Sequence, residues 1–119
     1  MSAFTVHATL IHPEDRARSA PLDLLVDTGA IYTTLPTEVV TQMALATPYE
    51  RRVEFANGQR DVWRMGEVRV KLGAEERTTV FLAGPLGCRP LLGAVTLDEF
   101  GVTVDPNYQR LVPMSSFFV

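Results

Sequence analysis

Apolar and polar residues alternate along much of this chain, and the alternation has a period of two residues. It is regular over residues 4–10, 22–26 and 68–72, where every second side chain is apolar. Alternate side chains point to opposite faces of a β-strand, so this period predicts strands with one buried face. Further short strands are predicted at residues 31–35, 51–55, 62–65, 79–83, 102–104 and 110–112. We therefore predict an all-β fold.

Turn-forming segments separate these strands and indicate how they pair. The polar segment 13–19 lies between the first two strands, which should form a hairpin. Asn57-Gly58 is the strongest hairpin signal in the chain, because both residue types tolerate a positive φ. It predicts a long, exposed hairpin. Turns are also expected at residues 73–76 and 105–107.

Two short helical segments interrupt the β pattern. Pro36, with Glu38 behind it, is typical of a helix start, and the apolar stripe that follows predicts a helix of two or three turns over residues 36–45. Thr96 and Glu99 have the spacing of a capping box, which predicts a helical turn. Gly101 is placed to end that turn.

Composition and charge restrict the class of protein. The 119 residues fit one domain, residues 1–119, and leave no length for a second. Hydrophobic residues make up 46% and charged residues 21%, a balance that predicts a folded core rather than a disordered chain. The net charge is only -3 and the arginines are scattered, so no nucleic-acid partner is expected.

The N-terminal segment and the few potential ligands restrict it further. Residues 1–10 have neither a signal-peptide pattern nor an apolar run that could span a membrane, so we expect a soluble, cytoplasmic protein with no membrane partner. The single cysteine, Cys88, excludes an internal disulfide, and with only His7 and His12 beside it there is no zinc-type ligand set. We expect no metal and no organic cofactor.

The segment Asp27-Thr28-Gly29-Ala30 carries the chemistry that the sequence suggests. A strand of mostly apolar residues runs directly into Asp27, a small residue follows Gly29, and β structure resumes afterwards. Such a turn presents one carboxylate at the edge of a sheet, and Gly29 permits a backbone approach that a side chain would block. The alternative is a turn aspartate that only accepts hydrogen bonds from nearby backbone amides.

A single carboxylate is not enough for peptide hydrolysis without a metal. The reaction needs a base for water and an acid for the carbonyl, and two adjacent carboxyl groups that share one proton supply both. This chain offers one such carboxylate, so a second Asp27 has to come from another copy related by a twofold axis. The hypothesis of catalysis therefore includes a homodimer.

Three features together resemble the retropepsin-like, retroviral-type aspartic proteases, and most of all their small bacterial members. They are the segment 24–30, the Leu91-Leu92-Gly93 segment whose glycine is sixty-six positions after Asp27, and the hairpin between them, where such proteases carry their flap. The match in order and spacing covers most of residues 4–114. It implies a small closed or partly open β-barrel of the retropepsin, or pepsin half-lobe, type with one short helix and one helical turn.

The resemblance also implies a role for each matching residue. Asp27 would be the catalytic carboxylate, Thr28 would hydrogen-bond across the twofold axis, and Gly29 with Ala30 would complete the catalytic loop. The strand packed behind this loop would consist of Leu91, Leu92 and Gly93. The flap tip, which would contact substrate, would consist of Ala56, Asn57, Gly58 and Gln59.

The sequence departs from the retroviral members in two places. Retroviral proteases commonly have arginine and asparagine after the glycine of the apolar segment, whereas Ala94-Val95-Thr96 follows Gly93 here. The turn at Asn57-Gly58 also has fewer glycines than a retroviral flap. This turn and the helix expected over residues 36–45 are more similar to the bacterial relatives. Other contacts must replace the polar dimer contacts of the viral enzymes.

The function that this resemblance implies is an aspartic endopeptidase, active as a homodimer on extended peptide or protein substrates. An inactive peptide-binding or scaffolding dimer of the same fold is the main alternative, and a monomeric β interaction module is a third. Trp63 would pack the flap onto the body or line a substrate pocket. Residues 115–119, with the Phe4 strand, are a candidate intersubunit sheet, because apolar chain ends are uncommon in water.

Overall fold

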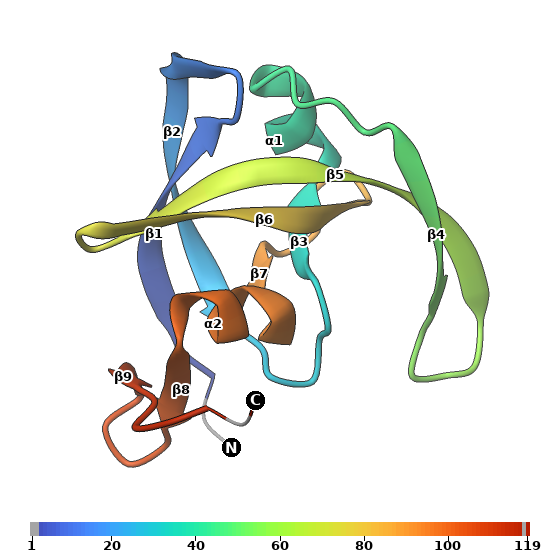
Figure 1. The fold of residues 1–119 in the computed structure, drawn as a ribbon. Helices are drawn as coiled ribbons and strands as arrows, with labels where there is room; N and C mark the ends of the chain where they lie inside the picture. Colours follow the sequence, from blue (N-terminus) through green and yellow to red (C-terminus); the bar gives the residue numbers. More distant parts are fainter. Residues whose placement is uncertain (1–2, 118) are drawn as a thin grey trace.

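The computed structural model describes residues 3–117 and 119, and the strands dominate it (Figure 1). Nine strands and two short helices follow one another along these residues: β1 (Thr5–His12), β2 (Asp15–Val26), β3 (Thr33–Pro36), α1 (Thr37–Gln42), β4 (Tyr49–Glu54), β5 (Arg60–Leu72), β6 (Glu75–Gly84), β7 (Leu91–Leu92), α2 (Ala94–Phe100), β8 (Val102–Asp105) and β9 (Arg110–Pro113). The all-β prediction is confirmed.

Seven of the strands form one sheet that curls back on itself. The order is β1-β2-β7-β3-β6-β5-β4, and an additional antiparallel pairing of β1 with β5, centred on Leu10 and Val70, joins the two sides of the sheet. This pairing closes a barrel and leaves β4 outside the ring, where it pairs only with β5. The expected small, closed or partly open barrel is thus confirmed.

The core fills the barrel with inward-facing apolar side chains, several of them at the alternating positions identified in the sequence. Those with no exposed surface are Leu10, Leu24, Leu35, Val68, Val70, Phe81 and Leu92. Fully burying a side chain of this kind contributes about 1.5 to 3 kcal/mol. Six strands contribute these side chains: β1, β2, β3, β5, β6 and β7. The core therefore holds together strands that are far apart in sequence.

The first hairpin is tighter than expected. β1 and β2 pair antiparallel, as predicted, but β2 begins at Asp15, so most of the segment expected as a turn belongs to the strand. Only Pro13 and Glu14 separate the two strands. Residues 15–19 are exposed, and a strand with no buried face has no reason to show apolar alternation.

The expected strands at 62–65 and 68–72 are one continuous strand, β5. Gly66 between them lies within the strand opposite Phe81, and a Cβ there would collide with the backbone of Ala46. The glycine therefore marks a close approach of two backbone segments rather than a strand end.

The helix expected over residues 36–45 is shorter in the structure. Pro36 is its N-cap and α1 ends at Gln42, because Ala44 adopts a left-handed φ of 53°. The Leu45 amide still donates to the Val40 carbonyl at 3.0 Å, which draws Met43 and Leu45 into the core. Val40 and Met43 of the expected apolar stripe are thus buried, but the chain after Gln42 is not helical.

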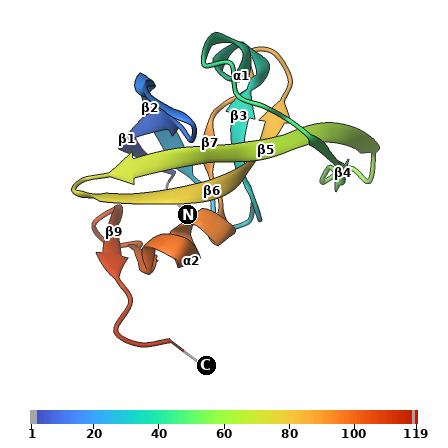
Figure 2. The same ribbon diagram turned by 45° about the horizontal axis from the view of Figure 1, so that its top comes forward.

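The start of α2 corrects a second helix prediction. The helix begins at Ala94 with Gly93 as its N-cap, and no side chain caps it, so the capping box of Thr96 and Glu99 does not form. Gly101 ends the helix in the left-handed conformation, at φ 66°, as predicted. The expected strands on either side of the 105–107 turn form the two-stranded β8–β9 sheet. Beyond β9, the C-terminal segment extends away from the barrel (Figure 2).

Candidate active site

The candidate loop begins where β2 leaves the barrel. β2 and β7 pair in parallel, with Leu25 beside Leu91 and Val26 beside Leu92. The Asp27 amide then donates to the Leu92 carbonyl at 3.1 Å, so the ladder continues one residue past the strand. This contact between segments 24–30 and 91–93, which the resemblance implies, fixes Asp27 at the end of a central strand.

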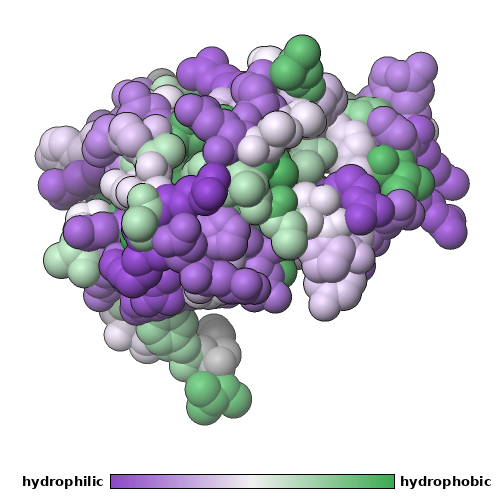
Figure 3. All heavy atoms as spheres, turned by 90° about the horizontal axis from the view of Figure 1, so that it is seen from above, coloured by the Kyte–Doolittle hydropathy of each residue, from purple (hydrophilic) through white to green (hydrophobic). Residues whose placement is uncertain are grey.

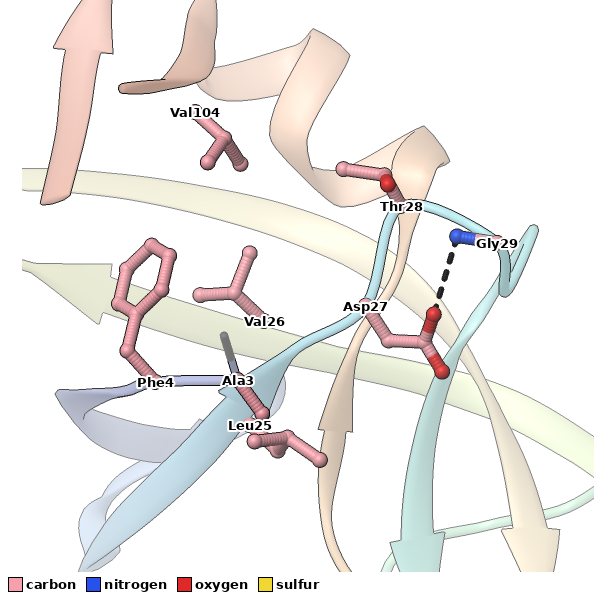
Figure 4. A pocket seen from close by; sticks show the side chains of 8 residues that line it. All are labelled: Ala3, Phe4, Leu25, Val26, Asp27, Thr28, Gly29 and Val104. Atoms are coloured by element: carbon pink, nitrogen blue, oxygen red, sulfur yellow. Dashed lines mark hydrogen bonds between the residues drawn. The ribbon is translucent and has the colours of Figure 1, made fainter. Parts of the chain in front are cut away.

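A short turn fixes the Asp27 carboxylate. The Gly29 amide donates to Oδ1 at 3.0 Å, and the Ala30 amide donates to the Asp27 carbonyl at 3.2 Å. Figure 4 shows the carboxylate turned toward Gly29, with Thr28 projecting from the loop on another side. Oδ1 therefore accepts a backbone hydrogen bond, as the alternative interpretation of a turn aspartate requires. Oδ2 has no hydrogen bond to any described residue.

The far end of the loop is attached to the start of α2. The Ala94 amide donates to the Ala30 carbonyl at 2.8 Å, and the Val95 amide donates to the Ile31 carbonyl at 2.9 Å. Gly93 lies directly against the backbone of Tyr32, because a Cβ at this position would come within 2.5 Å of the Tyr32 carbonyl oxygen. The position therefore requires glycine, and the helix closes tightly behind the loop.

Buried threonine hydroxyls form a chain of hydrogen bonds behind this contact. Gly93 donates its amide to Thr33 Oγ1 at 3.1 Å, Thr33 and Thr96 are 2.7 Å apart, Thr96 and Thr79 are 2.8 Å apart, and Thr79 donates to Glu99 Oε1 at 2.6 Å. Since Thr33 accepts at one end and Thr79 donates at the other, the hydroxyl protons have one consistent direction. Each hydroxyl donates once and accepts once, so the buried polar groups are satisfied.

Two open cavities meet at the loop. One, of about 430 Å³, is lined by Ala3, Phe4, Leu25, Val26, Asp27, Thr28, Gly29 and Val104. Apart from Asp27 and Thr28 this lining is apolar, and Phe4, Val26 and Val104 face one another across it (Figure 4). We call it the terminal cavity, because the N-terminal segment and β8 form its sides.

The second cavity lies beneath the β4–β5 hairpin and has a volume of about 520 Å³. Gly29, Ala30, Ile31 and Tyr32 of the loop line one side, and Arg51 to Phe55 of β4 and its end line the other. Figure 1 shows this hairpin projecting beyond the barrel on the side of the loop between β2 and β3. We call it the flap cavity.

The hairpin turn differs in type from the expected one. The Phe55 amide donates to the Gln59 carbonyl at 2.8 Å, and the Gly58 amide donates to the Phe55 carbonyl at 2.9 Å. Only Gly58, at φ 85°, has a positive φ, whereas Asn57 does not. The loop is thus a three-residue turn with a glycine bulge, and the Asn57 side chain accepts the Gln59 amide at 2.9 Å. Ala56, Asn57, Gly58 and Gln59 are all exposed at its tip.

Comparisons with known proteins agree with this geometry. A family model described as aspartyl protease matches residues 16–94, two thirds of the chain. The chain belongs to the aspartyl protease family. Among solved structures, the EIAV protease complexed with an inhibitor is similar, with a TM-score of 0.63 and 20% identity over 87% of this chain and 93% of that one. That likeness concerns the fold, which is retropepsin-like as expected. No curated protein matches the sequence significantly.

Family membership confirms the enzyme class expected from the sequence, an aspartic-type endopeptidase. The match spans the Asp27 loop, the β4–β5 hairpin and the apolar segment up to Ala94. Within residues 3–117 and 119 of this aspartyl protease, no helix is long and apolar enough to cross a membrane. The same residues contain no group of three or more His, Cys, Asp or Glu side chains that could hold a metal ion.

Trp63 of the aspartyl protease packs within the hairpin and also lines the flap cavity. The indole packs edge-on against Phe55, with ring centroids 5.8 Å apart, and it also lines the flap cavity. Its Nε1 donates to Asp61 at 3.3 Å. The residue therefore braces the hairpin from its inner side while it presents apolar surface to the cavity.

Sequence reasoning missed several residues at this site. Tyr32 and Arg51 line the flap cavity, and Val104 lines the terminal cavity. The alternation in β4 predicts only that Arg51, Val53 and Phe55 share one face, without indicating which face turns inward. No local pattern identifies the threonine chain, because its members lie far apart in sequence and each resembles an ordinary strand or helix threonine.

Proposed function

We propose that this aspartyl protease is a homodimeric endopeptidase in which Asp27 of each subunit forms one catalytic dyad. The observation that carries the proposal is the single Asp27 carboxylate at the end of a central strand, where one of its oxygens accepts a hydrogen bond and the other accepts none from the described residues. Among the described residues that line the terminal cavity, Asp27 is the one acid. A second copy of the loop would supply the missing partner.

The terminal cavity supports the position of the dimer contact. Phe4, Val26 and Val104 leave an apolar surface next to Asp27, and Thr28 is exposed beside it. Apolar surface adjoining a functional loop is typical of an interface. Thr28 would hydrogen-bond to the corresponding loop of the partner subunit, so that the two carboxylates approach without displacing Gly29.

Residues 115–119 are the second part of this proposed interface. Phe117 is 58% exposed, and its ring lies over Gly101, where a Cβ would come 3.1 Å from the ring edge. Figure 3 shows apolar atoms at the end of the segment that projects from an otherwise mostly hydrophilic surface. Phe118 of this segment lies outside the described residues. Pairing with the partner subunit would cover these side chains.

Two aspartates this close share one proton, and the mechanism follows from that. A water molecule between them attacks the substrate carbonyl carbon while the ionised carboxylate takes its proton. The protonated carboxyl donates its proton to the carbonyl oxygen, which gives a tetrahedral diol. Breakdown of the diol returns a proton to the leaving nitrogen and breaks the peptide bond. The Gly29 amide keeps one Asp27 oxygen oriented throughout.

The flap cavity would hold the substrate as an extended strand. Strand-like backbone hydrogen bonds position such a peptide, and alternate side chains enter apolar pockets. Leu91, Leu92 and Gly93 would act indirectly, by fixing the loop from behind. The flap tip, Ala56 to Gln59, would close over the peptide and exclude water.

The test compares the purified protein with its Asp27→Asn variant on a mixed peptide library from about pH 4 to 7.5. Asparagine keeps the size and the Gly29 hydrogen bond but cannot accept a proton from water. We expect peptide cleavage by the wild type and a loss of at least about a thousandfold in the variant. Cleavage that persists in a variant of unchanged oligomeric state would contradict the assignment. A dimer that binds peptides without cleaving them would instead select the scaffolding function.

A further inference from the structure

The flap cavity carries a positive charge that the proposed mechanism does not use. Its charged lining residues are Arg51, Arg52 and Glu54. Glu54 forms an ion pair with Arg60, with 2.8 Å between Oε1 and Nε. Neither Arg51 nor Arg52 forms an ion pair with an acidic side chain in the described part of the chain. The cavity thus contains cationic groups without internal counter-ions.

Arg51 reaches from the flap to the opposite wall of the cavity. It lies directly across the β4–β5 pair from Trp63, and opposite residues of an antiparallel pair project from the same face. Its guanidinium carbon is 5.5 Å from the centroid of the Tyr32 ring, and Tyr32 belongs to the segment that follows Asp27. A cation–π contact therefore holds the guanidinium between flap and floor.

Its surroundings leave this guanidinium open to an incoming carboxylate. Asp61 projects from the same face of the hairpin, but its oxygens accept hydrogen bonds from the Val62 amide at 2.8 Å and the Trp63 indole at 3.3 Å. Apart from Gly29, Ala30 and Thr34, the uncharged lining of the cavity consists of larger apolar or aromatic residues: Ile31, Tyr32, Val53, Phe55, Trp63 and Leu82. Arg51 is itself exposed, so an anionic side chain can reach it from solvent.

We propose that Arg51 is a specificity-determining residue that selects peptides with an acidic side chain next to apolar or aromatic residues. The inference rests on the proposed function, since it takes the ligand of the flap cavity to be an extended peptide. An Asp or Glu carboxylate would pair with the edge of the guanidinium while Tyr32 supports its face. In a symmetric dimer, one such position lies on each side of the cleaved bond.

Binding is measured so that the test does not require turnover. Fluorescein-labelled peptides of about eight residues, apolar elsewhere, carry Glu at each position in turn, and matched peptides carry Gln there. Their affinities for the Asp27→Asn protein are compared by fluorescence anisotropy at about pH 6, where free Glu is ionised. We expect at least one position at which Glu binds about fivefold or more tightly than Gln, with a smaller difference at about 0.5 M salt.

Variants assign this preference to Arg51. Arg51→Gln should abolish the difference between Glu and Gln peptides, and Arg51→Glu should favour Lys over Gln at the same position. Lys71→Gln is the matched control, because it removes one positive charge from an exposed position of β5 that does not line the flap cavity. The Lys71→Gln variant should prefer Glu over Gln peptides as strongly as the Asp27→Asn protein without this second substitution.

The outcomes separate this inference from the proposed function. Equal binding of Glu and Gln peptides at every position, no detectable peptide binding, or a Glu preference that survives in Arg51→Gln would overturn the role of Arg51. Wild-type cleavage that depends on Asp27 would leave the proposed function standing in each of those cases. If the Glu preference is lost in Arg51→Gln but the wild-type protein cleaves no peptide, the inference is supported and the catalytic proposal is rejected.

Discussion

The backbone amide of Gly93 donates a hydrogen bond of 3.1 Å to the hydroxyl of Thr33, sixty residues earlier in the chain. Through Thr96 and Thr79 this bond continues to the carboxylate of Glu99. These hydrogen bonds connect β3, β6 and α2 with the residue that follows β7, so they hold the support of the Asp27 loop in place from behind. Substitutions of these threonines should therefore alter the stability of the site without changing its surface.

Thr96→Val tests the hydroxyl chain most directly. Valine keeps the shape of threonine but leaves the Thr33 hydroxyl without an acceptor and Thr79 without a donor. An unsatisfied buried polar group costs about 1 to 3 kcal/mol, so we expect the free energy of unfolding to fall by that amount. Urea denaturation measures it. Thr96→Ser, which keeps the hydroxyl, should lose clearly less, and equal losses in the two variants would show that packing alone matters.

Gly93→Ala should be more severe than its size suggests. The new methyl group would lie 2.5 Å from the Tyr32 carbonyl oxygen and 2.7 Å from the Thr33 nitrogen, both of them backbone atoms. Backbone cannot move aside like a flexible side chain, so we expect a loss of about 3 kcal/mol or an unfolded product. Gly73→Asn is the control, because that turn has open space and asparagine tolerates its φ of 58°. If Gly93→Ala has the same free energy of unfolding as Gly73→Asn, Gly93 does not lie as close to the backbone of Tyr32 and Thr33 as described.

Part of this architecture could be predicted from the sequence because the physical signal is local. Alternation identified β1 and residues 68–72 of β5, and the mostly apolar strand before Asp27 identified the end of β2. The left-handed Gly101 was predicted for the same reason, since a glycine after a helical turn has a local conformational explanation. The barrel itself came from resemblance, because alternation shows that a strand has a buried face but not which strands close the ring.

The features that could not be predicted depend on distant partners. Thr96 has the local pattern of a helix cap, yet Thr33 and Thr79 bind its hydroxyl, and no neighbouring residue indicates this. Gly66 resembles a strand boundary until the approach of Ala46 explains it. The placement of Arg51 over Tyr32 likewise requires the flap and the loop to face one another. The roles of the catalytic-loop and flap residues stay predictions for the experiments above.

An ion cluster away from the site gives a prediction for pH. Hydrogen bonds from Arg16 and then Arg69 lower the pKa of Glu76 from 4.5 to about 2. A lowered folded-state pKa means that the cluster stabilises the fold above pH 4.5 and that this contribution is lost as the pH falls from 4.5 toward about 2. The melting temperature of Glu76→Gln should therefore lie below that of the wild type at neutral pH, and the two should converge in acid.

The control for this pH prediction is Glu67→Gln, which removes an exposed negative charge of β5 that forms no ion pair among the described residues. Differential scanning calorimetry at several pH values between about 7 and 2.5 would supply the melting temperatures. A gap between wild type and Glu76→Gln that stays constant down to the lowest pH would show that the Arg16–Glu76–Arg69 cluster does not stabilise the fold.

Deletion of residues 117–119 tests the proposed interface. Phe117 and Val119 are exposed apolar residues at the end of a projecting segment, and burial against a partner subunit would give them a favourable contact. Sedimentation equilibrium should show a shift toward monomer, and cleavage should then depend on protein concentration, because mass action governs assembly of the dyad. Leu86→Ser is the control, since Leu86 is 77% exposed on the loop before β7 and lines neither the terminal nor the flap cavity. If the shortened protein keeps its melting temperature and still sediments as a dimer, the C-terminal segment is not part of the interface.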